Sequence, residues 1–456
     1  MSAVASAQSA PAAPNALLVG PILPTLLRFA LPNMGAMLAT ALAAVAETSY
    51  VGRFGSPALA GMALVFPFVM LQTMLSAGAM GGGVSSAISR ALGAGDSARA
   101  NALAVHALWI ALALGTAFLV LMEVFGSALL SALGGRGDAL TQAVAYSEVA
   151  FAGSIFVWIV NTLASVIRGS GNMKVPSATL FALSIAQVLF GGALGLGWGP
   201  WPALGMRGVA AGSVIAYFAG AAYLWVYLAT GRGRVSLPMR HTPVDRKQLK
   251  DILRVGAVAC ISPFQTVLTI LVLTRLVAEF GTNALAGYGI GTRLEFLLVP
   301  IAFAIGVASV PLVGMAMGAG NVKRARQAAW TAAAVAAIVL GALGLVVTFA
   351  PDLWTTLYTH DESVLQSARS YFLWAGPCYG LFGLGLSLYF SSLGAGKALG
   401  PVLAGTLRLV TVAVGGALLA WSHSPAWAIF ALVGAGMAAY GLSSVLIVRY
   451  TKWGEN

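Results

Sequence analysis

Charged residues are scarce in this sequence: Asp, Glu, Lys and Arg together make up 8% of its 456 residues. A soluble globular domain carries roughly 25% charged residues. Hydrophobic residues reach 59%, and the mean hydropathy is +0.89. The composition therefore excludes an ordinary soluble domain and predicts an integral membrane protein.

Residues that build enzyme sites are also few. The two cysteines, Cys260 and Cys378, lie in apolar runs, which favours buried small side chains over a disulfide or a metal site. The segment SSLGAGKA at 391–398 lacks the first Gly and the final Ser or Thr of a phosphate-binding loop. None of the four histidines lies in a ligand or triad spacing, so we predict no enzyme activity and no cofactor. These histidines are His106, His241, His360 and His423.

The first 21 residues have no basic stretch ahead of an apolar segment, as a cleavable signal peptide would have. We expect residues 1–21 to form a disordered cytoplasmic tail. The net charge of +12 comes from Lys and Arg scattered between apolar runs, not from one basic face. That distribution indicates membrane topology and argues against nucleic acid as a partner.

Twelve apolar runs, separated by Gly, Pro or charged residues, are each long enough to cross ~30 Å of hydrocarbon as a helix. We therefore predict an all-α integral membrane protein with twelve transmembrane helices. Pro67 and Pro300 lie inside two of the longer runs and predict breaks there. The runs cover approximately residues 26–50, 58–88, 102–124, 140–167, 177–199, 208–230, 250–278, 284–316, 327–350, 363–392, 398–420 and 426–449.

Basic residues set the predicted orientation. With the N-terminus in the cytoplasm, the inside segments collect most of the Lys and Arg, including the connector GRGRVSLPMRHTPVDRKQLKDILR at 231–254. We therefore expect a multi-pass protein of the plasma (inner) membrane with both termini cytoplasmic. The outside ends keep Arg53, Arg136, Arg207, Arg275 and Arg369.

The two halves of the sequence repeat. FGSPALAG at 54–61 returns as FGTNALAG at 280–287, and GAGDSARA at 93–100 returns as GAGNVKRA at 318–325. Six spans bring the chain back to the same side of the membrane, so the halves are parallel repeats related by a pseudo-two-fold axis. Two matched lobes suit an alternating-access transporter. The predicted parts are a six-helix N-lobe at 22–230, a basic cytoplasmic connector at 231–249 and a six-helix C-lobe at 250–451.

Three segments resemble the multidrug and toxic compound extrusion (MATE) family. They are LPNMGAMLATALAAVAETSYVGRFG with the following ALAG, the loop SRALGAGD, and GYGIGTRLEFLLVPIAF followed by GMAMGAGNVKRA. The resemblance spans roughly residues 22–450. It implies a twelve-helix protein with two six-helix lobes that exports amphipathic, often cationic, compounds in exchange for H⁺ or Na⁺.

Two acidic residues, Glu47 and Glu295, lie inside predicted spans and away from their outer ends. A charge in the bilayer costs about 2.5–3.5 kcal/mol on insertion scales, so such residues are commonly functional. The repeat counterpart of Glu47 is Leu273, so the scaffold does not require a carboxylate there. The resemblance implies cation coupling at this position, where the family usually has Asp. The alternative is that Glu47 reaches the membrane interface near Arg53.

Further polar residues in the spans are candidate substrate contacts. Asn33 and Thr40 share a helical face with Glu47, and Tyr288 shares one with Glu295. Arg293 lies about 200° away from Glu295 around a regular helix, so the two side chains cannot face the same space. Glu295 either serves ion or substrate binding or joins a structural ion pair that holds the lobes together. The candidate substrate contacts are Asn33, Thr40, Asn161, Gln187, Gln265, Tyr288, Arg293 and Tyr379.

The resemblance also bears on the coupling ion. Gln187 and Gln265 fall roughly where branches of the family carry cation ligands, and Gly191 stands where an Asp is common. Neutral residues at these positions favour H⁺ over Na⁺. We predict a monomeric, H⁺-coupled antiporter that exports hydrophobic or cationic compounds, with a proton and substrate competing for Glu47 in a lipid membrane.

Three alternatives stay open. One is Na⁺-coupled drug export. Another is a lipid-linked precursor flippase of the same superfamily, which needs a basic cavity for pyrophosphate and has only Arg293 and Arg408 to supply it. A non-transporting membrane scaffold is disfavoured by the two-lobe repeat and the intramembrane acid.

Overall fold

The computed structural model describes residues 16–238 and 243–454, and these residues form helices and no strands. Apolar sequence favours helices in a membrane because a helix satisfies its backbone hydrogen bonds within its own segment. The N-lobe comprises α1 (Ala16–Val19), α2 (Ile22–Val51), η1 (Gly52–Phe54), α3 (Ser56–Thr73), the π-helix η2 (Met74–Met80), α4 (Gly81–Gly93), α5 (Ser97–Ala132), α6 (Gly137–Ala152), α7 (Ser154–Gly169), α8 (Lys174–Leu196) and α9 (Gly205–Ala229).

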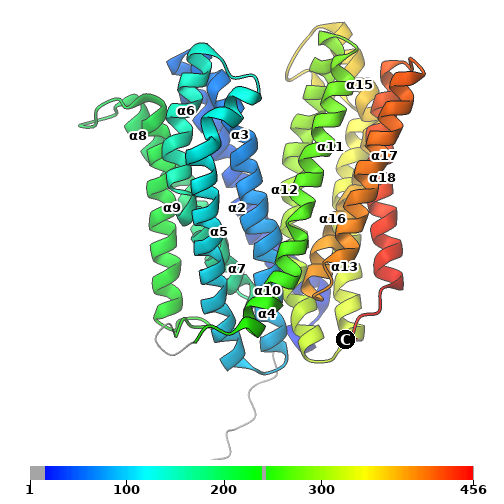
Figure 1. Ribbon diagram of the computed structural model, residues 1–456. Coiled ribbons are helices and arrows are strands. Elements are labelled where there is room, and N and C mark those ends of the chain that lie inside the picture. Colours follow the sequence, from blue (N-terminus) through cyan, green and yellow to red (C-terminus); the bar gives the residue numbers. More distant parts are fainter. Residues whose placement is uncertain (1–15, 239–242, 455–456) are drawn as a thin grey trace, which may run out of the picture.

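The C-lobe begins with a helix that continues into a second across Cys260. Its helices lie beside those of the N-lobe in a second bundle (Figure 1). The C-lobe comprises α10 (Arg246–Ala259), α11 (Ile261–Ala278), α12 (Thr282–Gly318), α13 (Val322–Phe349), α14 (Asp352–Thr355), α15 (Glu362–Ala375), η4 (Gly376–Cys378), α16 (Tyr379–Gly394), α17 (Leu399–Trp421) and α18 (Ala426–Tyr450).

The all-α membrane fold predicted from the sequence is confirmed. In the described part of the chain, 10 helical segments are long and apolar enough to cross a membrane, and the pair α6 and α7, bent by 49°, makes an eleventh. The remaining predicted span, 363–392, is divided by η4 into α15 and α16. The helices are thus consistent with twelve spans in two lobes.

The prolines do not end helices, so the breaks predicted at Pro67 and Pro300 are wrong. Helix α3 continues past Pro67 to Thr73, and α12 is continuous through Pro300 and Pro311. Packed neighbouring helices can satisfy the backbone group that a proline leaves without a partner. The second span instead changes its winding at the π-helix η2, which follows α3 directly.

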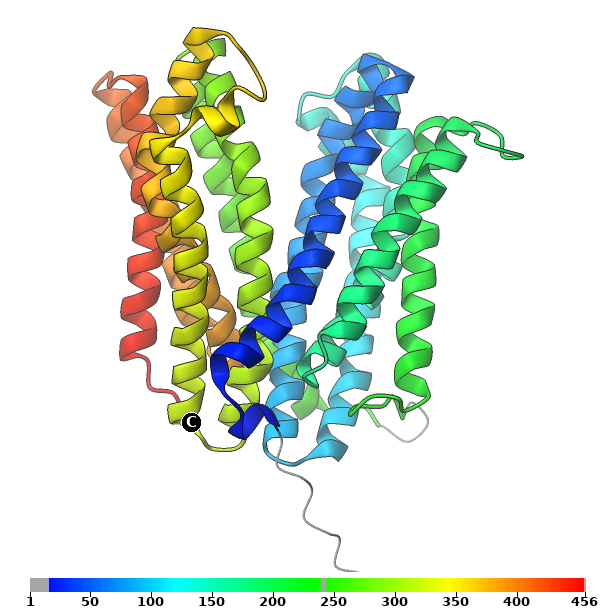
Figure 2. The same cartoon turned by 180° about the vertical axis from the view of Figure 1, so that it is seen from behind.

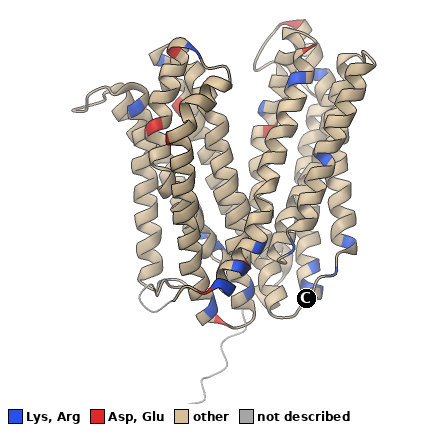
Figure 3. Cartoon of the chain, viewed as in Figure 1, with Lys and Arg blue, Asp and Glu red and all other residues tan. Residues whose placement is uncertain are grey.

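The two lobes lie close together at the end of the molecule that carries the described C-terminal residues, and they diverge toward the opposite end (Figures 1 and 2). These are called the lower and upper ends, as they stand in Figure 1. Lys and Arg gather along the lower end, whereas the upper end carries both signs of charge (Figure 3). Contacts between the lobes run mainly through α2 and α4 of the N-lobe and α10 and α12 of the C-lobe.

Two segments outside the main spans differ from simple loops. The predicted tail, 1–21, is described from Ala16 onward, where residues form α1 and Leu17 is buried; residues 1–15 lie outside the described part. Within the predicted connector, 231–249, residues 239–242 also lie outside it, and α10 begins at Arg246. Because α10 packs against α4 and α5, the first helix of the C-lobe is in direct contact with the N-lobe.

Candidate functional site

Glu47 is buried inside the N-lobe, with 4% of its surface exposed. It lies on α2, and Ser213 of α9 donates its hydroxyl to the carboxylate at 3.1 Å. The amide of Gln187 on α8 also faces this carboxylate. None of the ion pairs among the described residues includes Glu47. Its immediate surroundings are therefore polar but without a basic partner.

Tyrosines complete the surroundings of Glu47. Tyr50, Tyr146 and Tyr217 lie within electrostatic range of the carboxylate. The buried Tyr50 hydroxyl has no hydrogen-bond partner among the described residues, and a Cβ on Gly191 would lie 2.7 Å from its oxygen. Tyr50 thus fills the space that a side chain at position 191 would need. An Asp at position 191 would therefore clash with Tyr50 where α2 packs against α8.

A second intramembrane carboxylate lies in the C-lobe. Glu295 on α12 accepts a hydrogen bond from the hydroxyl of Tyr371 on α15. The rings of Tyr288 and Tyr371 pack edge to face with centroids 5.7 Å apart, and the buried hydroxyl of Tyr379 lies beside them. Arg408 on α17 is close enough to act electrostatically on Glu295. Unlike Glu47, this carboxylate has a basic neighbour.

Arg293 does not join Glu295. Its side chain is exposed, and its guanidinium carbon lies 5.0 Å from the centroid of the Tyr358 ring. Neither Arg293 nor Glu295 belongs to an ion pair among the described residues. The ion pair between lobes that the sequence left open is therefore absent from the described part of the chain.

Asn33 and Thr40 lie on the face of α2 that also carries Glu47, but each has its own partner. The Asn33 amide donates to the carbonyl of Ala304 at 3.4 Å, which links α2 to α12 across the lobes. The Thr40 hydroxyl lies 3.2 Å from that of Ser184 on α8. This polar face of α2 therefore extends from a contact between the lobes, at Asn33, to the buried carboxylate of Glu47.

Asn161 and Gln265 lie apart from both carboxylates. Asn161 on α7 donates to the hydroxyl of Ser76 in η2 at 2.8 Å, within the N-lobe. Gln265 on α11 donates to the hydroxyl of Thr406 on α17 at 2.7 Å, within the C-lobe. Of the predicted substrate contacts, the structure brings Gln187 to Glu47 and brings Tyr288 and Tyr379 to Glu295.

The sequence reasoning missed several neighbours of the two acids. Ser213, Tyr146 and Tyr217 surround Glu47, and Tyr371 binds Glu295. All four lie on helices other than the one that carries the acid. No spacing in the sequence joins them, because a single Ser or Tyr in an apolar span gives no sign of which helix it meets.

A known protein family matches both halves of the sequence repeat, one in each lobe of the structure. The sequence profile of the MatE family matches residues 32–191 and 259–418, one segment in each lobe. The chain belongs to the MatE family. This MATE chain is therefore a membrane transporter by family, and its two acids lie in opposite lobes of a transporter fold.

Individual relatives of this MATE chain are more distant. A probable multidrug resistance protein, NorM of Thermotoga maritima, is 26% identical over 352 residues, covering 75% of this chain and 74% of its own. The FAD transporter of Shewanella oneidensis is 24% identical, covering 81% and 82%. A solved MOP superfamily transporter from Pyrococcus furiosus has the same fold, with a TM-score of 0.88 at 23% identity over 95% of this chain and 96% of its own.

Proposed function

We propose that this MATE transporter is a secondary active antiporter that exports hydrophobic or cationic compounds in exchange for protons. Alternating access between the two lobes carries the compound across the plasma membrane, with both termini in the cytoplasm. The observation that carries the proposal is Glu47, a carboxylate buried in a lobe and held by a hydroxyl and an amide, with no ion-pair partner among the residues that the structure describes. The multidrug relatives support a drug-like cargo.

Glu47 has the surroundings that proton coupling requires. A buried carboxylate must be neutralised by a proton, a cation or a fixed basic group. Because no basic group in the described part of the chain pairs with Glu47, a proton and a cationic compound can compete for the same charge. Competition of two ligands for one site couples their movements without direct contact between them.

Glu295 is the second proposed ion-coupling residue, and its surroundings suit a different part of the cycle. Its carboxylate is held by Tyr371 and lies near Arg408, so part of its charge is already balanced. The buried aromatic rings of Tyr288 and Tyr371 pack beside it, and aromatic rings attract organic cations. We therefore assign Glu295 to cargo binding as well as to charge balance in the C-lobe.

The test is transport by purified protein in liposomes under an imposed pH gradient or an imposed Na⁺ gradient, with the lipophilic cation ethidium as cargo. We expect the pH gradient to drive ethidium movement in the wild type and Glu47→Gln to abolish the dependence on pH. Glu148→Gln is the matched control, because Glu148 pairs with Arg207 at the surface, 49% exposed.

Three results would contradict this proposal. Transport that follows the Na⁺ gradient and ignores the pH gradient would replace protons with Na⁺. Normal coupling in Glu47→Gln would remove Glu47 from the mechanism. FAD, the cargo named for the Shewanella relative, is the second cargo to assay, and transport of FAD without ethidium would show that cationic compounds are not the cargo.

A further inference from the structure

The repeated loops GAGDSARA and GAGNVKRA form the same local structure in both lobes. Asp96 caps α5 by accepting from the backbone N–H of Arg99 at 2.8 Å, and Asn321 caps α13 by accepting from that of Arg324 at 2.9 Å. Side chains that accept from the third residue satisfy a free N–H group at a helix start. Because the caps match, Arg99 and Arg324 occupy equivalent positions at the lower ends of the two lobes.

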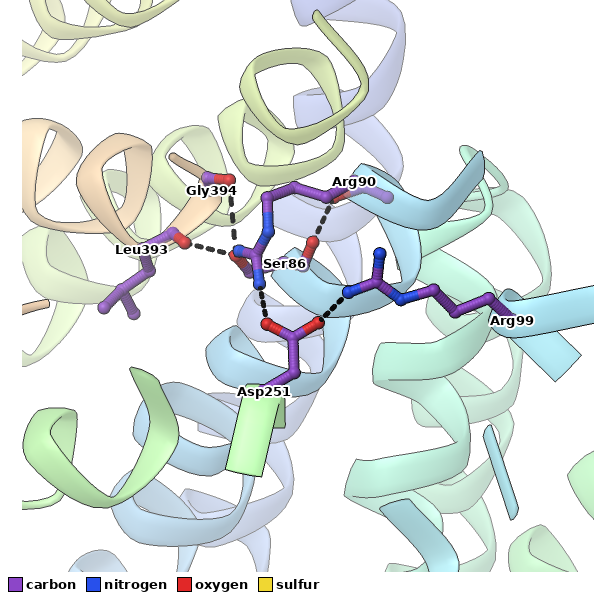
Figure 4. Close-up of polar contacts among 7 residues, drawn as sticks. Ser86, Arg90, Arg99, Asp251, Leu393 and Gly394 are labelled. Carbon is purple, nitrogen blue, oxygen red and sulfur yellow. Dashed lines mark hydrogen bonds and ion pairs between the residues drawn. The ribbon is translucent and has the colours of Figure 1, made fainter. Parts of the chain in front are cut away.

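Arg99 binds the C-lobe. Its guanidinium lies 2.7 Å from one carboxylate oxygen of Asp251, and the guanidinium of Arg90 lies 2.7 Å from the other oxygen. Figure 4 shows Asp251 held between the two arginines. Asp251 lies on α10, the helix that begins the first spanning segment of the C-lobe.

The same arginine cluster reaches a second C-lobe helix. Arg90 donates to the hydroxyl of Ser86, and that hydroxyl donates to the carbonyl of Leu393 and, at 3.2 Å, to that of Gly394 (Figure 4). These carbonyls lie at the lower end of α16. The N-lobe helix α4 is thus tied to both α10 and α16.

Arg324 makes the opposite connection. Its guanidinium donates to the backbone carbonyl of Leu17 from Nε at 3.1 Å and from Nη2 at 2.9 Å. Leu17 lies on α1, just before the first spanning helix of the N-lobe, and its side chain packs against Gly171 of the N-lobe. Arg99 therefore binds the start of the first spanning segment of the C-lobe, and Arg324 binds the segment just before the first spanning helix of the N-lobe.

Next to these contacts, the backbones of α4 and α12 pack closely against each other. A Cβ on Gly93 would lie 2.2 Å from the carbonyl oxygen of Met315, and a Cβ on Gly318 would lie 2.0 Å from that of Arg90. Gly93 and Gly318 are equivalent positions of the repeat, so α4 and α12 meet at the lower end through the same glycine in each lobe. The described lower end is therefore closed.

We propose that Arg99 and Arg324 form a reciprocal clasp that holds the lower end closed and opens when the lobes exchange access. The proposal rests on the alternating access of the proposed function. Opening the lower end separates α4 from α10 and α16, so the contacts of Asp251 and Ser86 break in that step. Neutralising Asp251 removes the acid through which Arg90 and Arg99, both in the N-lobe, attract the C-lobe, which favours opening.

The two arms of the clasp differ in chemistry. The Asp251 arm is a pair of charge-assisted hydrogen bonds whose acid is 23% exposed, whereas the Arg324 arm uses backbone carbonyls. Both arms have a charged donor, but a guanidinium attracts an ionised carboxylate more strongly than it attracts a neutral carbonyl. We therefore expect loss of Asp251 to open the lower end further than loss of Arg324 does.

The test measures two distances by double electron–electron resonance in the full-length protein, with Cys260 and Cys378 replaced by Ala. One spin-label pair, at Lys174 and Leu399, reports the lower end, and another, at Asp138 and Leu357, reports the upper end. All four positions are exposed. We expect one short lower-end distance in the parent protein and, in Asp251→Asn, a longer lower-end component with an open-to-closed ratio about tenfold higher.

Matched variants separate the clasp from general damage. Lys250→Gln alters the exposed neighbour of Asp251 and should leave both distances unchanged, whereas Arg99→Ala and Arg324→Ala should each raise the open component, and more so together. Unchanged lower-end distances in Asp251→Asn and in the double variant would overturn the clasp. Because the distances need no cargo, this result is independent of which compound or ion the protein transports.

Discussion

At the scale of the residue, Glu47 and Glu295 differ in what surrounds each carboxylate. Glu47 is held by Ser213 and Gln187 inside the N-lobe, and Glu295 by Tyr371 near Arg408 in the C-lobe. A fixed cation nearby competes with any proton or cargo cation. Glu47, which has no basic ion-pair partner among the described residues, is therefore the better acid for exchanging a proton for cargo.

The hydroxyl of Tyr371 is expected to stabilise the C-lobe site. Tyr371 is fully buried, and Tyr371→Phe removes the donor to Glu295 while keeping the ring and its packing. Loss of a hydrogen bond to a charged group lowers the free energy of unfolding by about 1.5–3 kcal/mol. Thermal unfolding in detergent measures this change. Tyr358→Phe is the control, because Tyr358 is 40% exposed and its ring stays available to Arg293; an equal loss in both variants would contradict the assignment.

The presence of two intramembrane acids could be predicted from the sequence, but their neighbours could not. Glu47 stands out because it is a charge in an apolar run, and periodicity alone places Asn33 and Thr40 on its face. Ser213 lies 166 residues away on α9, and only the packing of α2 beside α8 and α9 brings it to the carboxylate. Gly191 stands where the family commonly has an Asp, yet its contact with Tyr50 depends on that same packing.

At the scale of the element, hydropathy located the helices but not their irregularities. Each predicted run corresponds to a helix or a broken pair of helices, because burial of ~20 apolar residues leaves little choice of structure. The π-helix η2 and the bend between α6 and α7 carry no proline, whereas α12 continues through two. Such details depend on neighbouring helices, as where Phe303 packs 3.4 Å from the Cβ position of Gly78.

The crossing of α4 and α12 gives a prediction at this scale. In Gly93→Ala the new methyl group would lie 2.2 Å from the carbonyl oxygen of Met315, so the two helices must move apart. Overpacking of this kind costs about 1–3 kcal/mol or more. We expect a lower midpoint of thermal unfolding and a wider lower-end distance between spin labels at Lys174 and Leu399.

Gly289→Ala is the matched control for that crossing, since nothing lies within 4 Å of the Cβ position of Gly289 on the same helix α12. Alanine also favours a helix over glycine by about 1 kcal/mol. Gly289→Ala should therefore be neutral or stabilising. If Gly93→Ala behaved like Gly289→Ala, the close approach of α4 and α12 would not be needed for the closed lower end.

At the scale of the whole molecule, the repeat explains why the lobes meet so similarly from both sides. The loops at 93–100 and 318–325 give each lobe a helix cap, an arginine that contacts the other lobe, and a glycine at which α4 and α12 approach closely. The sequence shows the repetition, but not that each arginine reaches the other lobe. The acids break the symmetry, because Glu47 corresponds to Leu273 and has no counterpart in the C-lobe.

The direction in which the closed end faces is the last prediction. Lys and Arg gather at the lower end (Figure 3), and loops rich in these residues stay in the cytoplasm. The lower end is therefore expected to be cytoplasmic, and the diverging upper ends of the lobes to face outward. A single cysteine at Asp138 should react with a membrane-impermeant maleimide in intact cells, and one at Lys174 only in inverted vesicles. The opposite pattern would make the described state inward-facing and would assign the clasp to the external side of the membrane.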